Sequence, residues 1–170
     1  VGGETSIAMI EGNLFLGSST IVLQSTKANA EVRNLIITGN IFHTWNAENT
    51  TFVLDETHGS IASVSDTIVE SNEVGPSLTN KKLSTRATKT GSITKGSSSV
   101  VVNFTDSLLF DQKVGISQAR CYLENTSEAM GLSTVVSGNK VTVYLSSAIQ
   151  GDKARISCDV DQSSRSCAAH

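Results

Sequence analysis

The stretch NLIITGNIF, residues 34–42, decides the fold, because an apolar β-forming run leads into a polar residue, glycine, asparagine and a second apolar run. The same pattern occurs as IEGNLF at residues 10–15 and as VESNEV at residues 69–74. The asparagines of the three copies are Asn13, Asn40 and Asn72. Successive asparagines are 27 and 32 positions apart. Repeats of about 20–50 residues are typical of solenoids, so each copy is predicted to belong to one coil of a parallel β-solenoid.

The chemistry of the repeat suits a tight turn between short strands. Glycine tolerates positive φ, and asparagine adopts the left-handed region more readily than other residues. Asparagines at equivalent turns of stacked coils can also hydrogen-bond to one another. We therefore expect residues 7–74 to form stacked parallel coils in which the three asparagines occupy equivalent turns. The alternative is a chance recurrence of Gly-Asn in a chain rich in both residues.

The pattern NLIITGNIF resembles the coils of phage tailspike and capsular-depolymerase proteins, and of pectate-lyase-like β-helices generally. The resemblance covers about residues 5–76 and rests on coil texture. In that family a trimeric β-helix recognises and cleaves bacterial surface polysaccharide, and a compact C-terminal β-structured region locks the trimer. The resemblance implies an all-β chain: the last coils of a right-handed parallel β-helix followed by a small antiparallel β-sandwich. It also implies a location in the virion tail, outside the cell.

The two halves of the chain differ in pattern. Residues 77–98 are rich in Ser, Thr and Lys with little apolar periodicity, which predicts a basic linker or an extended strap. Later segments alternate between apolar and polar residues, and Gly138-Asn139 is a hairpin signal just before one of them, VTVYL at residues 141–145. The predicted organisation is a β-helix portion at 1–76, the linker at 77–98 and a C-terminal β-sandwich trimerisation domain at 99–170.

Composition and charge exclude several classes of function. Residues 1–76 hold nine acidic residues against Lys27 and Arg33, whereas residues 77–98 hold five basic residues and no acid. No aromatic residue is interleaved with these basic residues, so nucleic-acid binding is not expected. No run approaches the roughly 20 apolar residues of a membrane span, so membrane insertion is not expected. Because Val1 is not an initiator methionine, we expect the chain to be a piece of a longer polypeptide.

The low apolar content predicts self-association. Only 38% of the residues are hydrophobic and 5% aromatic, and a sandwich of about 70 residues buries little surface. Oligomerisation is the usual remedy when a small domain has no metal or disulfide framework. We therefore expect self-association, and the resemblance to tailspike coils implies a homotrimer. Three consecutive large apolar residues cannot all point inward on one strand, so the expected interface residues are Leu108, Leu109 and Phe110.

The candidate carbohydrate-binding site surrounds Trp45, the only tryptophan of the chain. His43, Asn46 and Glu48 flank it. A flat aromatic face can contact a pyranose ring, while amide and carboxylate groups bind its hydroxyls. The expected ligand is a bacterial surface polysaccharide, either O-antigen or capsule. The alternative places Trp45 at the end of the coil stack or in the subunit interface.

Acidic residues of the coils are candidates for glycoside hydrolysis. Retaining enzymes hold two carboxyl groups roughly 5–5.5 Å apart, and inverting enzymes hold them roughly 6.5–9.5 Å apart. The candidates are Glu48, Asp55, Glu56, Asp66, Glu70 and Glu73. Glu11 and Glu70 align with Thr38 between them, which indicates a solvated outward face. No motif supports catalysis, so catalytic residues are unassigned; we expect a parent glycanase or lyase and a fragment that is inactive alone.

The cysteines and aspartates give no sign of a metal or cofactor site. Cys121, Cys158 and Cys167 lack the spacing of metal ligands, and their odd number argues against a disulfide framework. Cys121 and Cys158 are therefore predicted to be buried free thiols. Asp159 and Asp161 lie on one face of a predicted strand, but calcium needs more oxygen ligands.

The sequence leaves three functions open. The first is the C-terminal trimerisation and receptor-contact module of a phage tailspike. The second is part of a polysaccharide-degrading hydrolase or lyase site built from residues 40–75. The third is a fragment of a bacterial surface adhesin. A long catalytic groove needs more coils upstream, which would separate the second function from the first, and an outer-membrane anchor in the full-length chain would favour the third.

Overall fold

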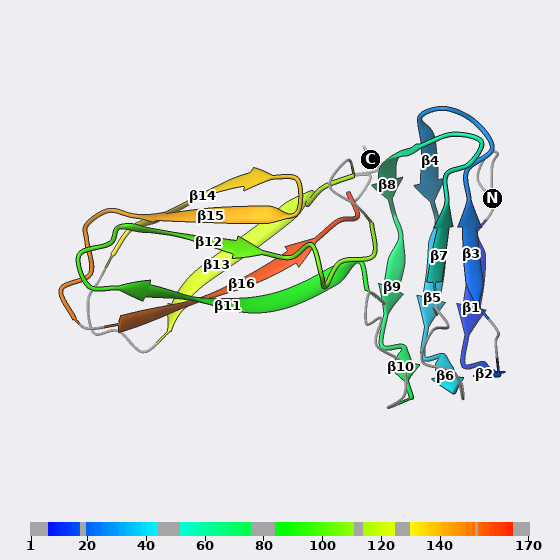
Figure 1. Cartoon of the computed structure of the whole chain (residues 1–170), viewed down its shortest axis with the longest axis horizontal. Coiled ribbons are helices and arrows are strands. Elements are labelled where there is room, and N and C mark those ends of the chain that lie inside the picture. The colour runs from blue at the N-terminus through cyan, green and yellow to red at the C-terminus, as the bar shows by residue number, and fades with distance from the viewer. Residues whose placement is uncertain are drawn as a thin grey trace, which may run out of the picture.

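The computed structural model of the chain describes residues 7–17, 20–43, 52–75, 84–110, 114–124, 130–151 and 153–164. Within these ranges the regular structure consists of 16 β-strands with no helix, so the predicted all-β class is confirmed. The strands form two units (Figure 1). We call residues 7–75 the coil unit and residues 84–164 the antiparallel unit. The antiparallel unit extends to one side of the coil unit, and its last described residue, Ser164, lies beside β8 (Ile61–Ser65).

The coil unit consists of successive coils that stack on one another. The first coil contains β1 (Ala8–Glu11), β2 (Leu14–Leu16), β3 (Ile21–Gln24) and β4 (Ala30–Arg33). The later coils contain β5 (Leu35–Thr38), β6 (Ile41–His43), β7 (Phe52–Asp55), β8, β9 (Ile68–Glu70) and β10 (Glu73–Val74). Each strand pairs in parallel with its equivalent one coil later, giving the sheets β1-β5-β9, β2-β6-β10, β3-β7 and β4-β8.

Apolar side chains in register form the core of the coil unit. Ile10, Ile37 and Val69 form one inward row on β1, β5 and β9. Ile37 and Val69 are completely buried. The rings of Phe15 and Phe42, on β2 and β6, stack with their centroids 4.7 Å apart and their planes 5° from parallel. Stacking of equivalent residues is thus what buries apolar surface here, and it explains why the sequence repeats.

An asparagine ladder confirms the predicted equivalence of the three turns. The side-chain amide of Asn13 donates to Oδ1 of Asn40 at 3.1 Å, and that of Asn40 donates to Oδ1 of Asn72 at 3.0 Å. Asn40 is completely buried and also donates to the carbonyl oxygen of Ile10 at 2.9 Å. Asn72 donates to the carbonyl oxygen of Ile37 at 3.0 Å. The ladder therefore satisfies main-chain groups that the turns leave without strand partners.

The residue before each ladder asparagine adopts the left-handed conformation. The φ angles are 65° at Gly12, 63° at Gly39 and 55° at Ser71. Glycine carries this conformation without a steric cost, whereas a side chain costs roughly 1–2 kcal/mol. A second corner, before β5 and β9, places Asn34 and Asp66 in the same region, at 51° and 46°. Residues that tolerate positive φ therefore determine where the coils bend.

The antiparallel unit consists of two three-stranded sheets with an apolar core between them. Its strands are β11 (Arg86–Thr94), β12 (Ser99–Asn103), β13 (Gln118–Glu124), β14 (Leu132–Ser137), β15 (Lys140–Leu145) and β16 (Lys153–Asp161). The sheets have the orders β11-β16-β13 and β12-β15-β14. The buried side chains that both sheets contribute include Ile93, Val102, Val141, Val143, Ile156 and Val160. Gly138, at a φ of 56°, forms the predicted hairpin turn between β14 and β15.

The prediction of a basic linker or strap at residues 77–98 is wrong for residues 86–94. Arg86–Thr94 form β11, which pairs with β16 along its whole length. A Cβ atom on Gly91 would lie 3.0 Å from Val102 and 3.1 Å from Val100. The valines of β12 thus fill the space over this position, so β11 needs no large apolar residue there. Its sequence consequently lacks the alternation by which strands are recognised.

The prediction of free thiols is also wrong, because Cys121 and Cys158 form a disulfide. The two residues are directly opposite each other on β13 and β16, with their Cα atoms 4.1 Å apart. Cross-strand neighbours at this distance place their side chains close together on one face of the sheet. The bond joins segments separated by 37 positions in the sequence.

Leu108, Leu109 and Phe110 do not form an exposed interface, contrary to the prediction. All three are buried, and they follow a turn after Phe104 rather than lying on one strand. Leu108 packs in the core of the antiparallel unit, whereas Leu109 and Phe110 pack in the core of the coil unit. The rule that strand side chains alternate does not apply to such a segment, so consecutive apolar residues are all buried within one chain.

Candidate functional site at the junction of the two units

Main-chain hydrogen bonds attach the antiparallel unit to the last coil. The amide of Thr85 donates to the carbonyl oxygen of Val69 at 2.9 Å. The amide of Ser164 donates to the carbonyl oxygen of Val64 at 3.1 Å, as part of a parallel bridge to β8. Segments from both ends of the antiparallel unit therefore occupy part of the edge that the last coil presents. Strand edges carry unpaired main-chain groups, and these contacts satisfy some of them.

Phe110 is held at the junction by two buried amide side chains. The main-chain amide of Phe110 donates to Oε1 of Gln162 at 3.0 Å, and its carbonyl oxygen accepts from Nε2 of Gln162 at 2.9 Å. The same oxygen accepts from Nδ2 of Asn139 at 2.9 Å. These bonds fix the main chain so that the ring packs against the end of the coil core.

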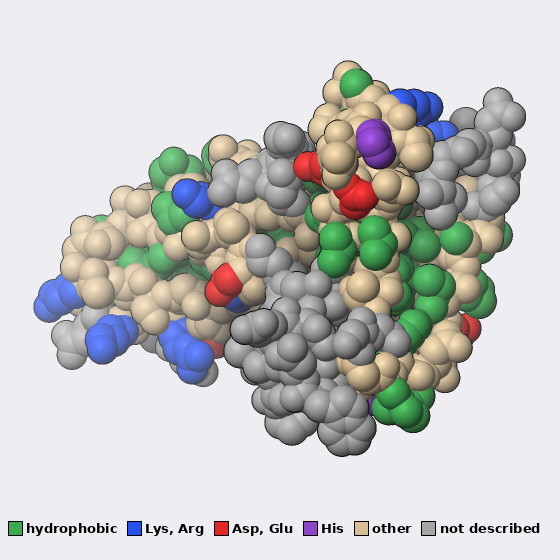
Figure 2. Space-filling view, turned by 45° about the vertical axis from the view of Figure 1, so that its right-hand side comes forward, with side chains coloured by type: hydrophobic (Ala, Val, Ile, Leu, Met, Phe, Trp, Pro, Cys, Tyr) green, Lys and Arg blue, Asp and Glu red, His purple; other side chains and the backbone are tan. Residues whose placement is uncertain are grey.

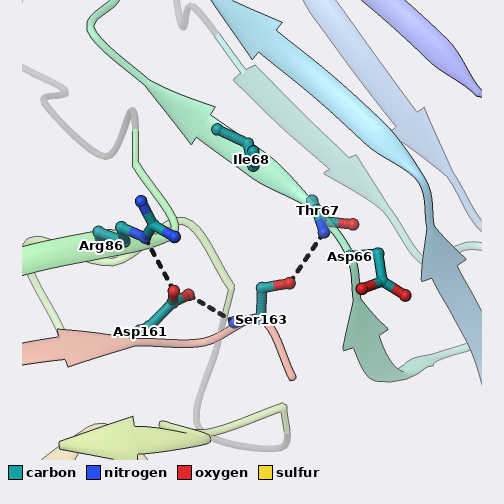
Figure 3. Close-up of a pocket in the computed structure, with 6 residues that line it drawn as sticks. All are labelled: Asp66, Thr67, Ile68, Arg86, Asp161 and Ser163. Carbon is teal, nitrogen blue, oxygen red and sulfur yellow. Dashed lines mark hydrogen bonds and ion pairs between the residues drawn. The ribbon is translucent and has the colours of Figure 1, made fainter. Parts of the chain in front are cut away.

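A pocket of about 200 Å³ opens at the junction (Figure 3). The coil unit and the antiparallel unit each contribute half of its lining. The lining residues are Asp66, Thr67, Ile68, Arg86, Asp161 and Ser163. It is therefore the place where the two units could together bind a ligand.

The polar groups of this pocket are engaged with one another. Arg86 donates from Nε to Asp161 at 2.8 Å and from Nη1 to Glu70 at 3.2 Å, and we call these three residues the junction triad. The hydrogen bond to Asp161 raises the pKa of Arg86 above its ordinary value. The other oxygen of Asp161 accepts from the amide of Ser163 at 2.8 Å, and Oγ of Ser163 accepts from the amide of Thr67 at 2.8 Å. This arrangement favours a structural connection between the units over a vacant ligand site.

The structure describes one of the four residues predicted to bind carbohydrate. His43 is the last residue of β6, where its side chain is exposed and its neighbour Phe42 points into the core. Trp45, Asn46 and Glu48 lie outside the described residues. The carbohydrate site around Trp45 therefore stays a prediction.

Two of the candidate acids stabilise a turn of the coil unit. Asp55 accepts hydrogen bonds from the amide and the hydroxyl of Thr57, and from Gln24 at 2.8 Å. The bond from the Thr57 hydroxyl is the largest cause that lowers the pKa of Asp55. Glu56 accepts from the amide of Ile61 at 2.6 Å. Both carboxylates thus have structural roles in the connection from β7 to β8.

The predicted alignment of Glu11, Thr38 and Glu70 is confirmed by the strand register. Two strand spacings separate the two glutamates, which corresponds to roughly 10 Å between their positions. Glu70 forms an ion pair with Arg86 of the antiparallel unit. Its carboxylate therefore serves the junction, and the alignment does not create a catalytic pair.

Asp159 and Asp161 have separate partners. Asp159 accepts a hydrogen bond from the hydroxyl of Thr88 at 2.7 Å, while Asp161 belongs to the junction triad. Among the described residues, no three His, Cys, Asp or Glu side chains are grouped so that they could hold a metal ion. In the same part of the chain, no helix is long and apolar enough to cross a membrane.

Sequence reasoning missed most of the junction. Arg86 fell within the predicted linker, and Gln162 and Ser163 follow the last strand without any motif. The sequence pattern offers Asp161 only as a candidate metal ligand. The partners of Arg86 lie 16 and 75 positions away, so no local pattern could have joined them.

Known proteins give no guide to the function of this chain, so only the geometry of its structure bears on it. No family model matches the chain, and no curated protein and no solved structure matches it.

Proposed function

We propose that this chain is the C-terminal portion of a phage tailspike that trimerises, stabilises the fibre and contacts the surface polysaccharide of the host. In this proposal the coil unit is the end of a right-handed parallel β-helix, and the antiparallel unit is a β-sandwich that closes it. The observation that carries the proposal is the junction, where main chain and side chains of the antiparallel unit cover the last coil.

Covering the last coil solves a physical problem of stacked parallel strands. An open strand edge exposes unpaired N–H and C=O groups and promotes pairing with other chains. Solenoids accordingly end in atypical capping segments. Here Thr85 and Ser164 bond to the last strands, and Phe110 covers the end of the apolar core. These contacts support a role as the terminal part of a fibre.

Outward-facing apolar rows on the coils support self-association. Met9, Ile36 and Ile68 lie in register on the outer face of β1-β5-β9, and Met9 is 58% exposed. Leu14 and Ile41 form a similar exposed pair on β2 and β6. Hydrophobic side chains gather visibly over the coils (Figure 2). Exposed apolar patches of this kind mark interaction surfaces.

Further copies of the same chain are the partners that suit these rows best. The rows repeat at the strand spacing of about 4.8 Å, so an identical copy carries rows of the same period. Copies arranged around an axis along the stack could therefore pack row against row. Cyclic symmetry of this kind is the usual arrangement of homo-oligomers, and the resemblance to tailspike coils specifies three copies.

The disulfide supports a location outside the cell. Disulfides persist in oxidising surroundings and are rare in the reducing cytosol. The bond between Cys121 and Cys158 joins two strands of the antiparallel unit. An active glycanase fragment draws no comparable support, because Asp55, Glu56 and Glu70 have structural partners.

Sedimentation velocity with two matched variants tests this function. Met9 on the coils and Val101 on the antiparallel unit have almost the same exposure, 58% and 57%. The wild-type chain should sediment as a trimer, Met9→Glu should shift it to monomers, and Val101→Glu should leave it trimeric. A monomeric wild type at every concentration would contradict the proposal. Trimers of both variants would contradict the coil interface.

A further inference from the structure

The outer face of the sheet β11-β16-β13 is built almost entirely from polar and aromatic side chains. The strand register arranges these residues in cross-strand rows. Three adjacent rows are Arg86–Asp161–Gln118, Thr88–Asp159–Arg120 and Thr90–Ser157–Tyr122. A pocket of about 400 Å³ lies over the first two rows. It is distinct in position from the pocket in Figure 3, although Arg86 and Asp161 border both.

Two side chains of this pocket have hydrogen-bonding capacity to spare. Arg120 and Gln118 are exposed, and neither side chain has a hydrogen bond or ion pair with any other residue that the structure describes. Asp159 uses one oxygen to accept from Thr88, at 2.7 Å, so its second oxygen is available. Arg86 and Asp161, by contrast, are engaged in the junction triad.

The available groups suit a pair of neighbouring hydroxyls. A guanidinium offers five N–H donors in a rigid planar fork, and a carboxylate only accepts. Arg120 and Asp159 are opposite each other on β13 and β16. One hydroxyl of a vicinal diol can donate to Asp159 while the adjacent hydroxyl accepts from Arg120. The amide of Gln118 can serve a third hydroxyl as donor or acceptor.

An aromatic side chain stands in the next row of the same face, beside the two rows that the pocket covers. Tyr122 lies two positions after Arg120 on β13, and 48% of it is exposed. An exposed tyrosine ring presents an apolar surface next to a polar hydroxyl. The C–H face of a pyranose ring could pack on it while the sugar hydroxyls reach Arg120 and Asp159.

The charges on this face favour a neutral ligand. Arg86 shares its row with Asp161, and Arg120 shares its row with Asp159. Each of these two rows therefore has no net charge, and the pocket over them has no excess of positive charge that would attract an anionic sugar.

We infer that this face binds neutral hexopyranose units of a polysaccharide, through Arg120, Asp159 and Gln118 for the hydroxyls and Tyr122 for the ring. The inference deepens the proposed function by adding a sugar contact within the antiparallel unit. It rests on the proposed function for the source of the sugar, but it does not depend on trimer formation.

Calorimetric titration with neutral and acidic oligosaccharides tests the inference. The neutral probes are hexasaccharides of glucose, galactose, mannose and N-acetylglucosamine, and the acidic probe is hexagalacturonate. At least one neutral probe should bind, more tightly than the acidic one. Arg120→Met and Tyr122→Leu should each weaken that binding at least tenfold, and Gln118→Ala should weaken it by a smaller factor.

Arg155→Met is the matched control, because Arg155 lies on the same outer face but pairs with Glu124 at 3.8 Å. It should leave the affinity unchanged, and all four variants should keep the wild-type unfolding midpoint. No binding of any neutral probe, preference for the acidic probe, or equal losses in Arg120→Met and Arg155→Met would each overturn the inference. The sugar affinity of each chain can be measured on a monomer as well as on a trimer. A failure of sugar binding is therefore distinguishable from a failure to form trimers.

Discussion

Replacing Asn40 by alanine should destabilise the coil unit more than any other change in the asparagine ladder. The buried side chain donates to Asn72 at 3.0 Å and to the carbonyl oxygen of Ile10 at 2.9 Å, and it accepts from the amide of Asn13 at 3.0 Å. Alanine leaves the carbonyl oxygen of Ile10 without this partner, whereas Oδ1 of Asn72 keeps its bond from the main-chain amide of Asn40 at 3.1 Å and the amide of the exposed Asn13 can bond to water. A buried polar group that loses its partner costs about 1–3 kcal/mol. With about 1–3 kcal/mol for the carbonyl of Ile10 and about 1 kcal/mol for the lost bond to Asn72, the free energy of unfolding should fall by about 2–4 kcal/mol.

Urea unfolding followed by circular dichroism measures this change, at a fixed chain concentration because association also contributes to stability. Asn13→Ala is the matched control, since Asn13 is exposed on the first rung and water can replace its bonds. It should cost only about 1 kcal/mol. Equal losses in the two variants would refute the reasoning, because they would show that burial within the ladder adds nothing.

Three further predictions concern the junction, the disulfide and acid stability. Phe110→Ala should lower the unfolding free energy by about 3–5 kcal/mol and separate the calorimetric transitions of the two units; a loss below about 1 kcal/mol would contradict its role. Joint replacement of Cys121 and Cys158 by alanine should cost about 4 kcal/mol by loop entropy, given their separation of 37 positions. Unchanged denaturant midpoints would contradict that value. The hydrogen bond from Lys89 lowers the pKa of Asp106 below its ordinary value of 3.8. This pair therefore stabilises the fold at pH values above 3.8, and the stabilisation is lost as the pH falls and Asp106 becomes protonated. Lys89→Met should therefore be less stable than wild type at neutral pH, and the difference in melting temperature should shrink as pH falls below about 4, to the part that comes from the bond of Lys89 to the carbonyl oxygen of Asn103; a difference that does not change with pH would argue against the ion pair.

The coil repeat could be predicted because its cause is local. Each turn needs a residue that tolerates positive φ, followed by an asparagine that bonds to the next coil. Both requirements are met within a stretch of six residues. They recur because each coil stacks on the next coil in the same way. The asparagines of the ladder, Asn13, Asn40 and Asn72, were therefore visible in the sequence.

Features that depend on pairing between distant segments could not be predicted. β11 lacks apolar alternation because the valines of β12 cover Gly91. The disulfide requires Cys121 and Cys158 to face each other across β13 and β16, and only the strand register determines this. The odd number of cysteines argues against a disulfide framework and therefore does not predict this bond.

The same limit applies to the candidate site. Glu70, Arg86 and Asp161 come from three separate segments and meet only because the antiparallel unit returns to the last coil. Leu109 and Phe110 are both buried because they follow a turn, where the alternation of strand side chains does not hold. In both cases the missing information was the position of the chain in space.

Native mass spectrometry of the purified chain tests the central claim most directly. The outward apolar rows of the coils need identical partners, and the junction supplies a closed end for each chain. The account predicts one dominant species of three chains, with a mass of three times 17.9 kDa. A dominant single chain of 17.9 kDa at all micromolar concentrations would contradict it.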